Sequence, residues 1–288
     1  MATKHLTDGD NAVQRPVAII GAAHRLPGTS NQGFWQQLCQ GADLVSTVAS
    51  DRWDSAIYTH PNPKQPGTAY TQAAGSLGDI AGFDHTFFGI SPREAAHMDP
   101  QQRIMLELAW EALEDAGIPP SQLRGTDCGV YAGVSSLDYS YRIAEDPSSI
   151  DSPTATGNTS SVVANRISHA LDLRGPSMAM DTACSSALMA FHQACQAIRA
   201  GETTTALTGA ISLHLHPLAF VLFSKANMLS PTGGSHVFDA RANGYVRSEG
   251  AGFFLLKDLE QAQADGDRIL ATVAASAANA DGHTSGLT

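Results

Sequence analysis

Cys184 occupies the position in this sequence that best suits a nucleophilic side chain. Residues 177–180 form a short apolar run that predicts a buried strand, and residues 185–200 predict a helix that ends at Gly201. The start of a helix carries unpaired backbone N–H groups and a partial positive charge, and both favour the reactive thiolate over the thiol. The position therefore predicts a nucleophilic cysteine, although a thiol hydrolase, a simple acyltransferase or a buried structural cysteine would fit this local pattern as well.

The predicted helix carries an apolar stripe that begins at Cys184. Counting along the helix gives Leu188, Phe191, Cys195 and Ile198, at spacings of four, three, four and three residues. Side chains at these spacings share one helix face, so we expect Cys184 to lie at the inner end of a buried helix. We expect Cys195, on the same stripe, to serve packing and not chemistry.

The other ionisable residues show weaker patterns. Asp181 precedes the cysteine by three residues, and we expect it to cap the helix start or to pair across a dimer, not to transfer protons. Arg247 and Glu249 are expected to form a structural ion pair or to lie at the surface. His214 and His216 alternate on a predicted strand end, but no cysteine or carboxylate pair lies nearby in sequence, so no metal site is predicted.

The order of elements favours an α/β fold with helix-covered sheets, because predicted strands and helices alternate along the chain. Residues 51–81 are rich in proline, glycine, threonine and alanine, and they predict a long surface excursion. The first 15 residues predict a flexible leader. The predicted helices cover residues 34–38, 98–116, 160–171 and 185–200, and the predicted strands cover residues 17–20, 129–133, 177–180, 205–213, 252–256 and 269–275.

The composition is that of a folded globular protein. The chain has 288 residues, of which 43% are hydrophobic and 16% charged, and its net charge of −11 disfavours nucleic acid and anionic membranes as partners. No apolar run approaches the roughly 20 residues of a membrane span, and residues 1–15 lack the apolar core of a signal peptide. The four cysteines have neither metal-ligand nor disulfide-scaffold spacing, so we expect a cytoplasmic protein.

The residues around Cys184 settle the local ambiguity. The run DTACSS at 181–186 resembles the active-site signature of β-ketoacyl synthases of the modular polyketide type. Further segments are similar to other blocks of that family and occur in its order: FFGISPRE at 87–94, MDPQQR at 98–103, TGN at 156–158, LRGPS at 173–177, FSKANMLSP at 223–231 and NGYVRSEG at 243–250. The resemblance covers nearly all of residues 16–288.

This resemblance implies a thiolase-like fold, in which two similar α/β halves stack their sheets between helix layers, usually as a homodimer. It implies acyl transfer from the phosphopantetheine arm of an acyl carrier protein to Cys184, followed by decarboxylative condensation with a malonyl-type extender. No cofactor bound by the chain itself is implied. The backbone N–H of Cys184 would serve as an oxyanion donor, with Asp181, Thr182 and Ser185 supporting the turn.

The sequence also departs from the family pattern. The family uses two histidines and a lysine in motifs reading HGTGT and KSNIGH, and neither motif occurs here, so no catalytic histidine is predicted among the eleven present. We expect residues 16–258 to form the N-terminal ketosynthase half, and residues 259–288 to begin the C-terminal half with one strand. The other part would come from a second polypeptide or from the remainder of a longer chain.

Two alternatives to a complete condensing enzyme follow from this departure. The cysteine could load acyl chains without condensing them, as an acyl-transferring relic. The chain could also be a non-catalytic piece that docks carrier proteins or another part of a synthase. An uncovered strand and sheet face promote aggregation. We therefore expect this chain alone to be neither stable nor active in condensation.

Overall fold

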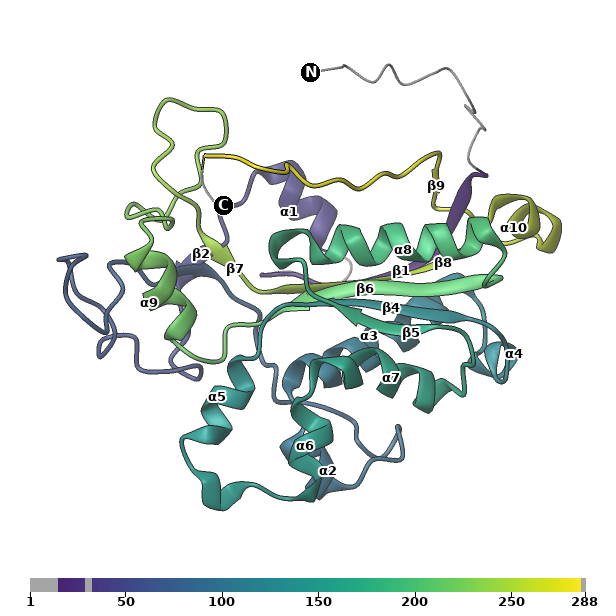
Figure 1. Ribbon diagram of the computed structural model, residues 1–288, viewed down its shortest axis with the longest axis horizontal. Coiled ribbons are helices and arrows are strands. Elements are labelled where there is room, and N and C mark those ends of the chain that lie inside the picture. The colour runs from purple at the N-terminus through teal and green to yellow at the C-terminus, as the bar shows by residue number, and fades with distance from the viewer. Residues whose placement is uncertain (1–14, 29–32, 286–288) are drawn as a thin grey trace.

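A computed structural model describes residues 15–28 and 33–285, and its central element is a six-stranded mixed sheet (Figure 1). The strand order is β5-β4-β6-β8-β1-β9. Strand β4 runs parallel to both β5 and β6, and the pairs β6–β8, β8–β1 and β1–β9 are antiparallel. The strands are β1 (Val17–Arg25), β4 (Gly129–Val134), β5 (Ser177–Met180), β6 (Thr205–Ser212), β8 (Gly250–Asp258) and β9 (Ala271–Val273).

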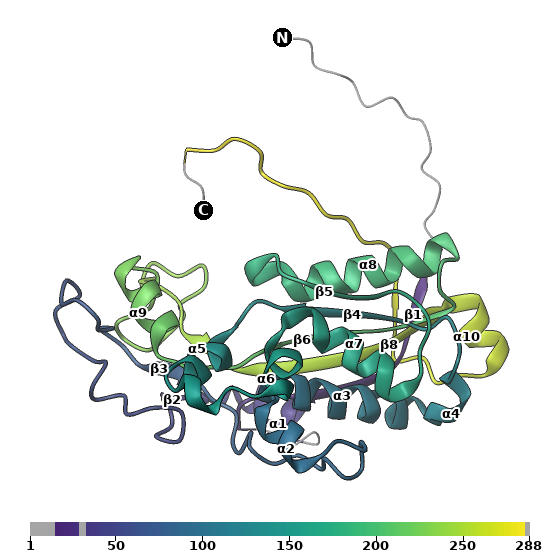
Figure 2. The same cartoon turned by 60° about the horizontal axis from the view of Figure 1, so that its bottom comes forward.

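Helices cover both faces of this sheet, which confirms the predicted α/β class. Helices α3 (Pro100–Ala116) and α7 (Ser160–Leu171) lie on one face, and α8 (Ser186–Ala200) lies on the other (Figure 2). Shorter helices surround this core: α1 (Phe34–Gln40), α2 (Pro92–His97), α4 (Pro120–Leu123), α5 (Asp138–Ala144), α6 (Ser152–Asn158), α9 (Leu218–Lys225) and α10 (Leu259–Asp265). A small second sheet has the order β2 (Val45–Thr47), β3 (Ala73–Gly75) and β7 (Arg247–Ser248).

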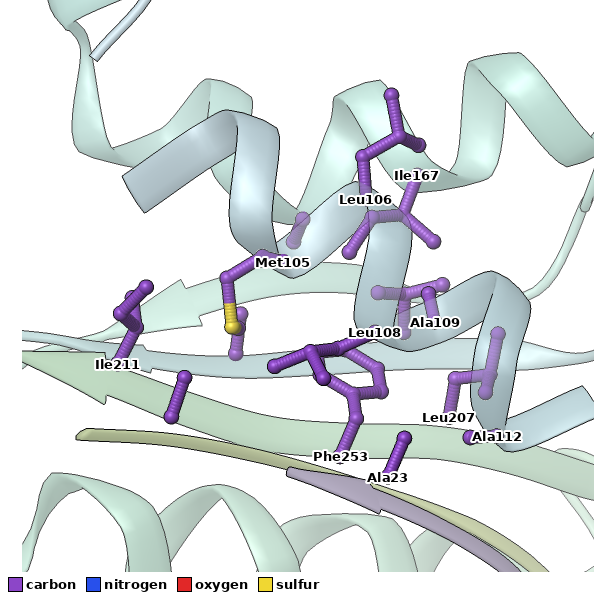
Figure 3. Packing of buried hydrophobic residues seen from close by; sticks show 14 of the residues in the cluster. Ala23, Met105, Leu106, Leu108, Ala109, Ala112, Ile167, Leu207, Ile211 and Phe253 are labelled. Atoms are coloured by element: carbon purple, nitrogen blue, oxygen red, sulfur yellow. The ribbon is translucent and has the colours of Figure 1, made fainter. Parts of the chain in front are cut away.

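The largest hydrophobic core lies between α3 and the sheet (Figure 3). Apolar residues along α3 are buried because they recur at helical spacing, and they face strands β6 and β8. The packed residues include Met105, Leu108 and Ala109 of α3, with Leu207 of β6 and Phe253 of β8. This core fixes the sheet whose ends carry the candidate site.

Helix α8 packs differently from its predicted stripe. Its buried residues are small or lie in the later turns, and Ala190, Ala194 and Ile198 contact strands β4 and β6. Leu188 is 75% exposed, so the prediction that the stripe from Cys184 is buried along its whole length was wrong. Leu188 belongs to α8 and lies about two turns before the buried Cys195, so the stripe is covered only in the later turns of the helix.

Residues 51–81 contain more buried structure than their composition predicted. Trp53, Ala69 and Ala74 are buried, and they pack against Phe220 of α9 and Leu229 in a separate core cluster. The segment is irregular, as predicted, but it is not only a surface excursion. Composition alone could not show this, because Phe220 and Leu229, which complete the cluster, come from more than 160 residues further along the chain.

The last strand lies beside the first. Residues 271–273 form β9, which pairs antiparallel with Val17 to Ile19 of β1. The predicted strand at 269–275 therefore exists in shorter form, and it is the edge of the main sheet, paired on one side. Beyond β9 the chain crosses the outside of α8, where Ser276 contacts His192 and Arg199 through hydrogen bonds of 2.9 Å (Figure 2). The predicted leader at 1–15 falls almost wholly outside the described residues.

Within the described residues, no helix is both long enough and apolar enough to cross a membrane. This search did not include the residues outside the described ranges.

Asp99 gives the fold a pH dependence. Its Oδ1 accepts a hydrogen bond from the backbone N–H of Gln101 at 2.8 Å and caps α3, while Gln101 Nε2 donates to Oδ2 at 3.1 Å. Burial raises the pKa of Asp99 to about 6, in opposition to these hydrogen bonds. Because the folded chain keeps this proton to a higher pH than the unfolded chain does, stability falls as pH rises from about 4 to about 6.

Replacing Asp99 with asparagine removes this titration. The original chain loses stability between about pH 4 and about pH 6, and the variant does not. We therefore expect the free energy of unfolding of the variant minus that of the original chain to rise over this range, as measured by urea denaturation. Burial also raises the pKa of Glu107 and Asp138, which titrate in both proteins. Glu107 cancels in the difference, whereas Asp138 cancels only in part, because its charge contributes to the raised pKa of Asp99. A difference that stays constant across this range would contradict the assignment.

Candidate active site

The candidate nucleophile lies on a sharp turn between β5 and α8. Ala183, directly before Cys184, has a φ of 54°, which is unusual for a residue with a side chain. Asp181 Oδ1 accepts a hydrogen bond from the Ala183 N–H at 2.8 Å and stabilises this conformation. Such backbone strain persists where the surrounding contacts enforce it, and it concentrates at functional sites. Asp181 therefore holds the turn and does not cap the first residues of α8.

Hydroxyl groups tie the two ends of this turn together. Ser185 Oγ donates to the Thr182 carbonyl at 2.8 Å and also lies within hydrogen-bond distance, 2.9 Å, of Thr182 Oγ1. Ser186 Oγ accepts from the Thr182 N–H at 2.9 Å and donates to the Ala183 carbonyl at 2.7 Å. Ser186 is only 5% exposed, and it supports the turn as much as Ser185 does. The sequence analysis did not include Ser186 among the supporting residues. Its position four residues after Thr182, at the start of the predicted helix, could have indicated a hydrogen bond across the turn.

Gly133 sets the position of the turn relative to the sheet. A Cβ atom at Gly133 of β4 would lie 2.8 Å from the backbone C and O of Ser186 and 2.9 Å from the backbone N of Ala187. Real Cβ atoms essentially never approach backbone this closely. Only glycine allows the start of α8 to rest directly on the strand, so Gly133 belongs to the structural support of the site. The sequence analysis did not single it out.

Cys184 itself is exposed, as are the neighbouring residues 181–183 and Ser185. The expected burial of Cys184 at the inner end of a helix was therefore wrong. Because Cys184 belongs to the 3₁₀ turn and precedes α8, its side chain does not follow the buried positions of that helix. Cys128 and Cys195 are buried, and burial raises the pKa of each thiol, to about 11 for Cys128. Cys39 is exposed.

Cys184 opens onto a cavity of about 1000 Å³. The walls come from the ends of the central strands, from helices α5 and α9, and from β7, and most of them are apolar. The volume and the apolar walls suit an acyl chain. Residues that line this cavity include Asp181, Ala183, Cys184, Gly133, Ser135, Ser136, Asp138, Tyr141, Ile211, His214, Leu218, Leu222, Phe223, Arg247 and Phe254.

Glu249 forms a buried ion pair beneath the cavity wall, but with a different partner from the one predicted. Its carboxylate accepts from Arg52 Nε at 3.0 Å and Nη2 at 3.1 Å, and both side chains are at most 2% exposed. It also accepts from the backbone N–H groups of Leu77 and His214. The predicted pairing of Arg247 with Glu249 was therefore wrong, because a residue 197 positions away supplies the cation.

In the part of the chain that is described, no three histidine, cysteine, aspartate or glutamate side chains lie close enough together to hold a metal ion. His216 Nε2 lies 3.3 Å from Glu145 Oε1, and its Nδ1 accepts from the Leu218 N–H. His214 is buried away from that pair. His283 is exposed. None of these histidines shares the Cys184 turn.

The fold and site together define a class of protein: an α/β enzyme domain with a cysteine at a strained strand-to-helix turn beside an acyl-sized cavity. Comparison with known proteins then gives the family. The model of the β-ketoacyl synthase N-terminal domain matches residues 14–262. The chain belongs to the β-ketoacyl synthase family.

Several relatives show which members of the family are similar. One phenolphthiocerol/phthiocerol polyketide synthase protein of Mycobacterium tuberculosis is 49% identical over 279 residues, which are 96% of this chain and 18% of that protein. Another phenolphthiocerol/phthiocerol polyketide synthase protein, from Mycobacterium bovis, is 48% identical over 95% of this chain and 15% of that protein. The relatives are polyketide synthases, so the resemblance seen in the motifs is confirmed.

Solved ketosynthases share the fold. A cysteine-to-serine mutant of the ketosynthase from module 6 of the bacillaene synthase of Bacillus subtilis superposes with a TM-score of 0.87 at 39% identity, over 95% of this chain and 45% of that one. An oxazolomycin ketosynthase domain from Streptomyces albus gives 0.85 at 41% identity, over 89% of this chain and 46% of that one. The thiolase-like fold is confirmed. The chain spans less than half of these structures and under a fifth of the curated relatives.

Proposed function

We propose that Cys184 is the acyl-accepting nucleophile of a polyketide-type ketosynthase. One observation carries the proposal: Cys184 is exposed on a strained turn at the wall of a cavity large enough for an acyl chain. In this role Asp181, Thr182 and Ser185 position the turn, as their hydrogen bonds to its backbone support. The backbone N–H of Cys184 serves as an oxyanion donor for the acyl carbonyl.

The proposed first step is a thioester exchange. The Cys184 thiolate attacks the carbonyl carbon of an acyl thioester, a new C–S bond forms, and the bond to the pantetheine sulfur breaks. The pantetheine thiolate leaves and takes up a proton. A malonyl-type extender then loses CO₂, and its enolate attacks the carbonyl carbon of the Cys184 thioester. A C–C bond forms, the C–S bond to Cys184 breaks, and the β-ketoacyl product leaves the Cys184 thiolate free. The histidine and lysine motifs that the resemblance implies for this second step do not occur in this sequence.

The acyl donor in this proposal is the phosphopantetheine arm of an acyl carrier protein, in a cytoplasmic synthase. The polyketide synthases among the relatives are far longer than this chain, which supports a place within a larger assembly. We propose that residues 16–258 form the N-terminal ketosynthase half and residues 259–288 begin the C-terminal half, completed by a further fragment or by the remainder of a longer chain. A homodimer of the completed domain is part of the same proposal.

Family membership favours the ketosynthase over the two alternatives, the non-condensing acyl-transferring relic and the non-catalytic docking piece. The docking piece differs from the other two in what the chain can do with an acyl thioester. A docking piece would leave every cysteine unlabelled, whereas both the ketosynthase and the relic would form an acyl-cysteine. Acylation is therefore the first property to test.

We expect stoichiometric acylation of Cys184 when the chain is incubated with an acyl-pantetheine thioester, and no β-ketoacyl product from the chain alone. Peptide mass spectrometry locates the label among the four cysteines. Cys184→Ala should abolish labelling. Cys39→Ala is the matched control, because Cys39 is exposed but lies on α1, outside the cavity that Cys184 lines.

Two outcomes would contradict the proposal. Labelling spread equally over Cys39 and Cys184 would show ordinary thiol reactivity without a working pocket. Labelling that persists in Cys184→Ala would place the acyl group elsewhere. Formation of a β-ketoacyl product by the chain alone would instead contradict the expectation that condensation needs residues outside it.

A further inference from the structure

A cluster of aromatic side chains lies on the outer side of α3, formed by the helix and by the loop at residues 83–90. Phe87 is 54% exposed, and its ring meets that of Trp110 at 84° with 4.6 Å between the ring centres. Phe88 packs edge-on against both rings and stacks on Phe83. Phe83, Phe88 and Trp110 are partly buried against the main core, whereas Phe87 is exposed. Phe87 and Trp110 therefore form an aromatic corner at the surface.

Hydrogen bonds within the loop at 83–90 hold Phe87 in this position. Asp84 Oδ1 accepts from the Phe87 N–H at 3.0 Å. The His85 carbonyl accepts from the Ile90 N–H at 2.8 Å, and His85 Nδ1 lies 3.0 Å from the Ile90 carbonyl. A side chain that is already held in place loses little conformational entropy when a partner binds, and this preorganisation favours association.

Carboxylates surround the aromatic corner. Glu107 and Glu114 lie about one turn before and one turn after Trp110 on α3, and the Trp110 Nε1–H donates to Glu114 Oε1 at 2.9 Å. Among the described residues, no hydrogen bond or ion pair involves the Glu107 carboxylate. Burial raises the pKa of Glu107, and the charge of Asp84 acts in the same direction. The corner therefore has carboxylates on several sides.

The arginines whose charges act on Glu107 make their direct contacts elsewhere. Arg25 pairs with both carboxylate oxygens of Glu111, at 2.7 Å from Nη1 to Oε2. Arg103 Nη1 donates to the Ala81 carbonyl at 3.0 Å. In the part of the chain that the structure describes, the Glu107 carboxylate is thus left without a directly paired cation.

The outer side of α3 lies away from the last described residues. Helices α3 and α8 cover opposite faces of the main sheet, and the described residues after β9 run along α8 (Figure 2). These residues therefore do not cover Phe87 or Trp110. A second copy of this chain is a poor occupant, because its net charge of −11 adds to the negative charge at the corner instead of balancing it.

We propose that the aromatic corner and the carboxylates around it form a docking surface for a partner protein segment that inserts an arginine side chain. A guanidinium is attracted to the faces of aromatic rings, and its planar fork of N–H donors pairs with carboxylates, so it matches both features of this surface. An aliphatic side chain would use the rings alone. The proposal goes beyond the proposed function and does not depend on any reaction at Cys184.

The test uses three capped pentapeptides that differ only in the central residue, which is arginine, citrulline or leucine. Citrulline keeps the shape of arginine without its charge. The peptides are titrated into the chain with Trp35→Phe, which removes the exposed tryptophan of α1, so that a fluorescence change reports Trp110 and not the buried Trp53. We expect the dissociation constant of the arginine peptide to be about tenfold lower than those of the other two, which corresponds to about 1.4 kcal/mol. The difference should shrink at an ionic strength of about 1 M, where charges are screened beyond about 3 Å.

Two variants in the same background assign the preference to these residues. We expect Phe87→Ala and Glu107→Gln each to reduce the ratio of the citrulline to the arginine dissociation constant to about threefold or less, because each removes one of the two attractions. Phe238→Ala is the matched control, since Phe238 is a fully exposed phenylalanine in a different loop, and it should keep the tenfold ratio. Each ratio is measured within one variant, so a general loss of stability does not imitate the result.

Three results would overturn the proposal. Equal dissociation constants for the arginine and citrulline peptides would show that charge is not recognised. Equal constants for the arginine and leucine peptides would show an apolar surface without preference for a cation. A tenfold ratio that persists in both Phe87→Ala and Glu107→Gln would place arginine binding elsewhere on the chain. None of these results depends on whether Cys184 accepts an acyl group, so the proposed function is tested separately.

Discussion

Replacing Glu249 with alanine should lower the free energy of unfolding by about 3 to 5 kcal/mol, the largest stability loss expected from any single charge in this chain. The carboxylate is buried and accepts hydrogen bonds from the Arg52 side chain and from the backbone N–H groups of Leu77 and His214. Its removal leaves the Arg52 guanidinium, whose side chain is 2% exposed, without its buried counter-ion. The Asp51 carboxylate, 2.7 Å from Arg52 Nη1, is 60% exposed and compensates this charge only in part. A buried charge that has lost its buried partner costs more than the pair itself contributes.

Urea denaturation followed by tryptophan fluorescence measures this loss. Trp53 is the natural reporter, because it is 9% exposed and directly follows Arg52 in the chain. Arg268→Gln is the control, since it removes one partner of an ion pair with Asp115 whose side chains are 57% and 36% exposed. We expect that variant to lose less than about 1 kcal/mol.

Glu249→Gln completes the comparison, because it keeps the shape of the side chain and one accepting oxygen. We expect it to be less destabilised than Glu249→Ala and more than Arg268→Gln. Equal stability of Glu249→Ala and the control would contradict the buried ion pair.

Elements with a strong local pattern could be predicted from the sequence. The predicted helix at 160–171 matches α7 at both ends, and Gly117 and Gly201 end α3 and α8 with left-handed φ values, as expected of helix-terminating glycines. The helix predicted from residue 98 begins at Pro100 because Asp99 caps it, which the proline after an aspartate could have indicated. Local capping chemistry decides these boundaries.

Features that depend on distant contacts could not be predicted in this way. Position 184 was identified from its neighbours, but its exposure follows from a turn whose geometry needs Gly133 of another strand. The partner of Glu249 was misassigned because Arg52 lies 197 residues away and nothing in the local pattern pairs them. The contacts of Arg247 and His214 have the same origin, since both side chains pack against Phe220 of α9.

Gly133→Ala should slow acylation of Cys184 by about 100-fold while leaving most of the fold intact. The added methyl group would overlap the backbone of Ser186 and Ala187, atoms that cannot move aside as the end of a flexible side chain can. The start of α8, and with it the Cys184 turn, must therefore shift. A displacement of about 1 Å at a catalytic group is enough for a rate loss of about two orders of magnitude. Overpacking of this kind costs about 1 to 3 kcal/mol of stability.

Gly252→Ala is the matched control for this variant. Gly252 is also a strand glycine in the wall of the same cavity, but the nearest atom to its added Cβ is the carbonyl oxygen of Ala23 at 3.9 Å. We expect its acylation rate to stay within about threefold of the original. Equal rates for the two alanine variants would show that the close approach at Gly133 does not position the nucleophile. A large loss confined to Gly133→Ala, with the unfolding transition retained, would identify the contact between β4 and α8 as the support that places Cys184 in the cavity.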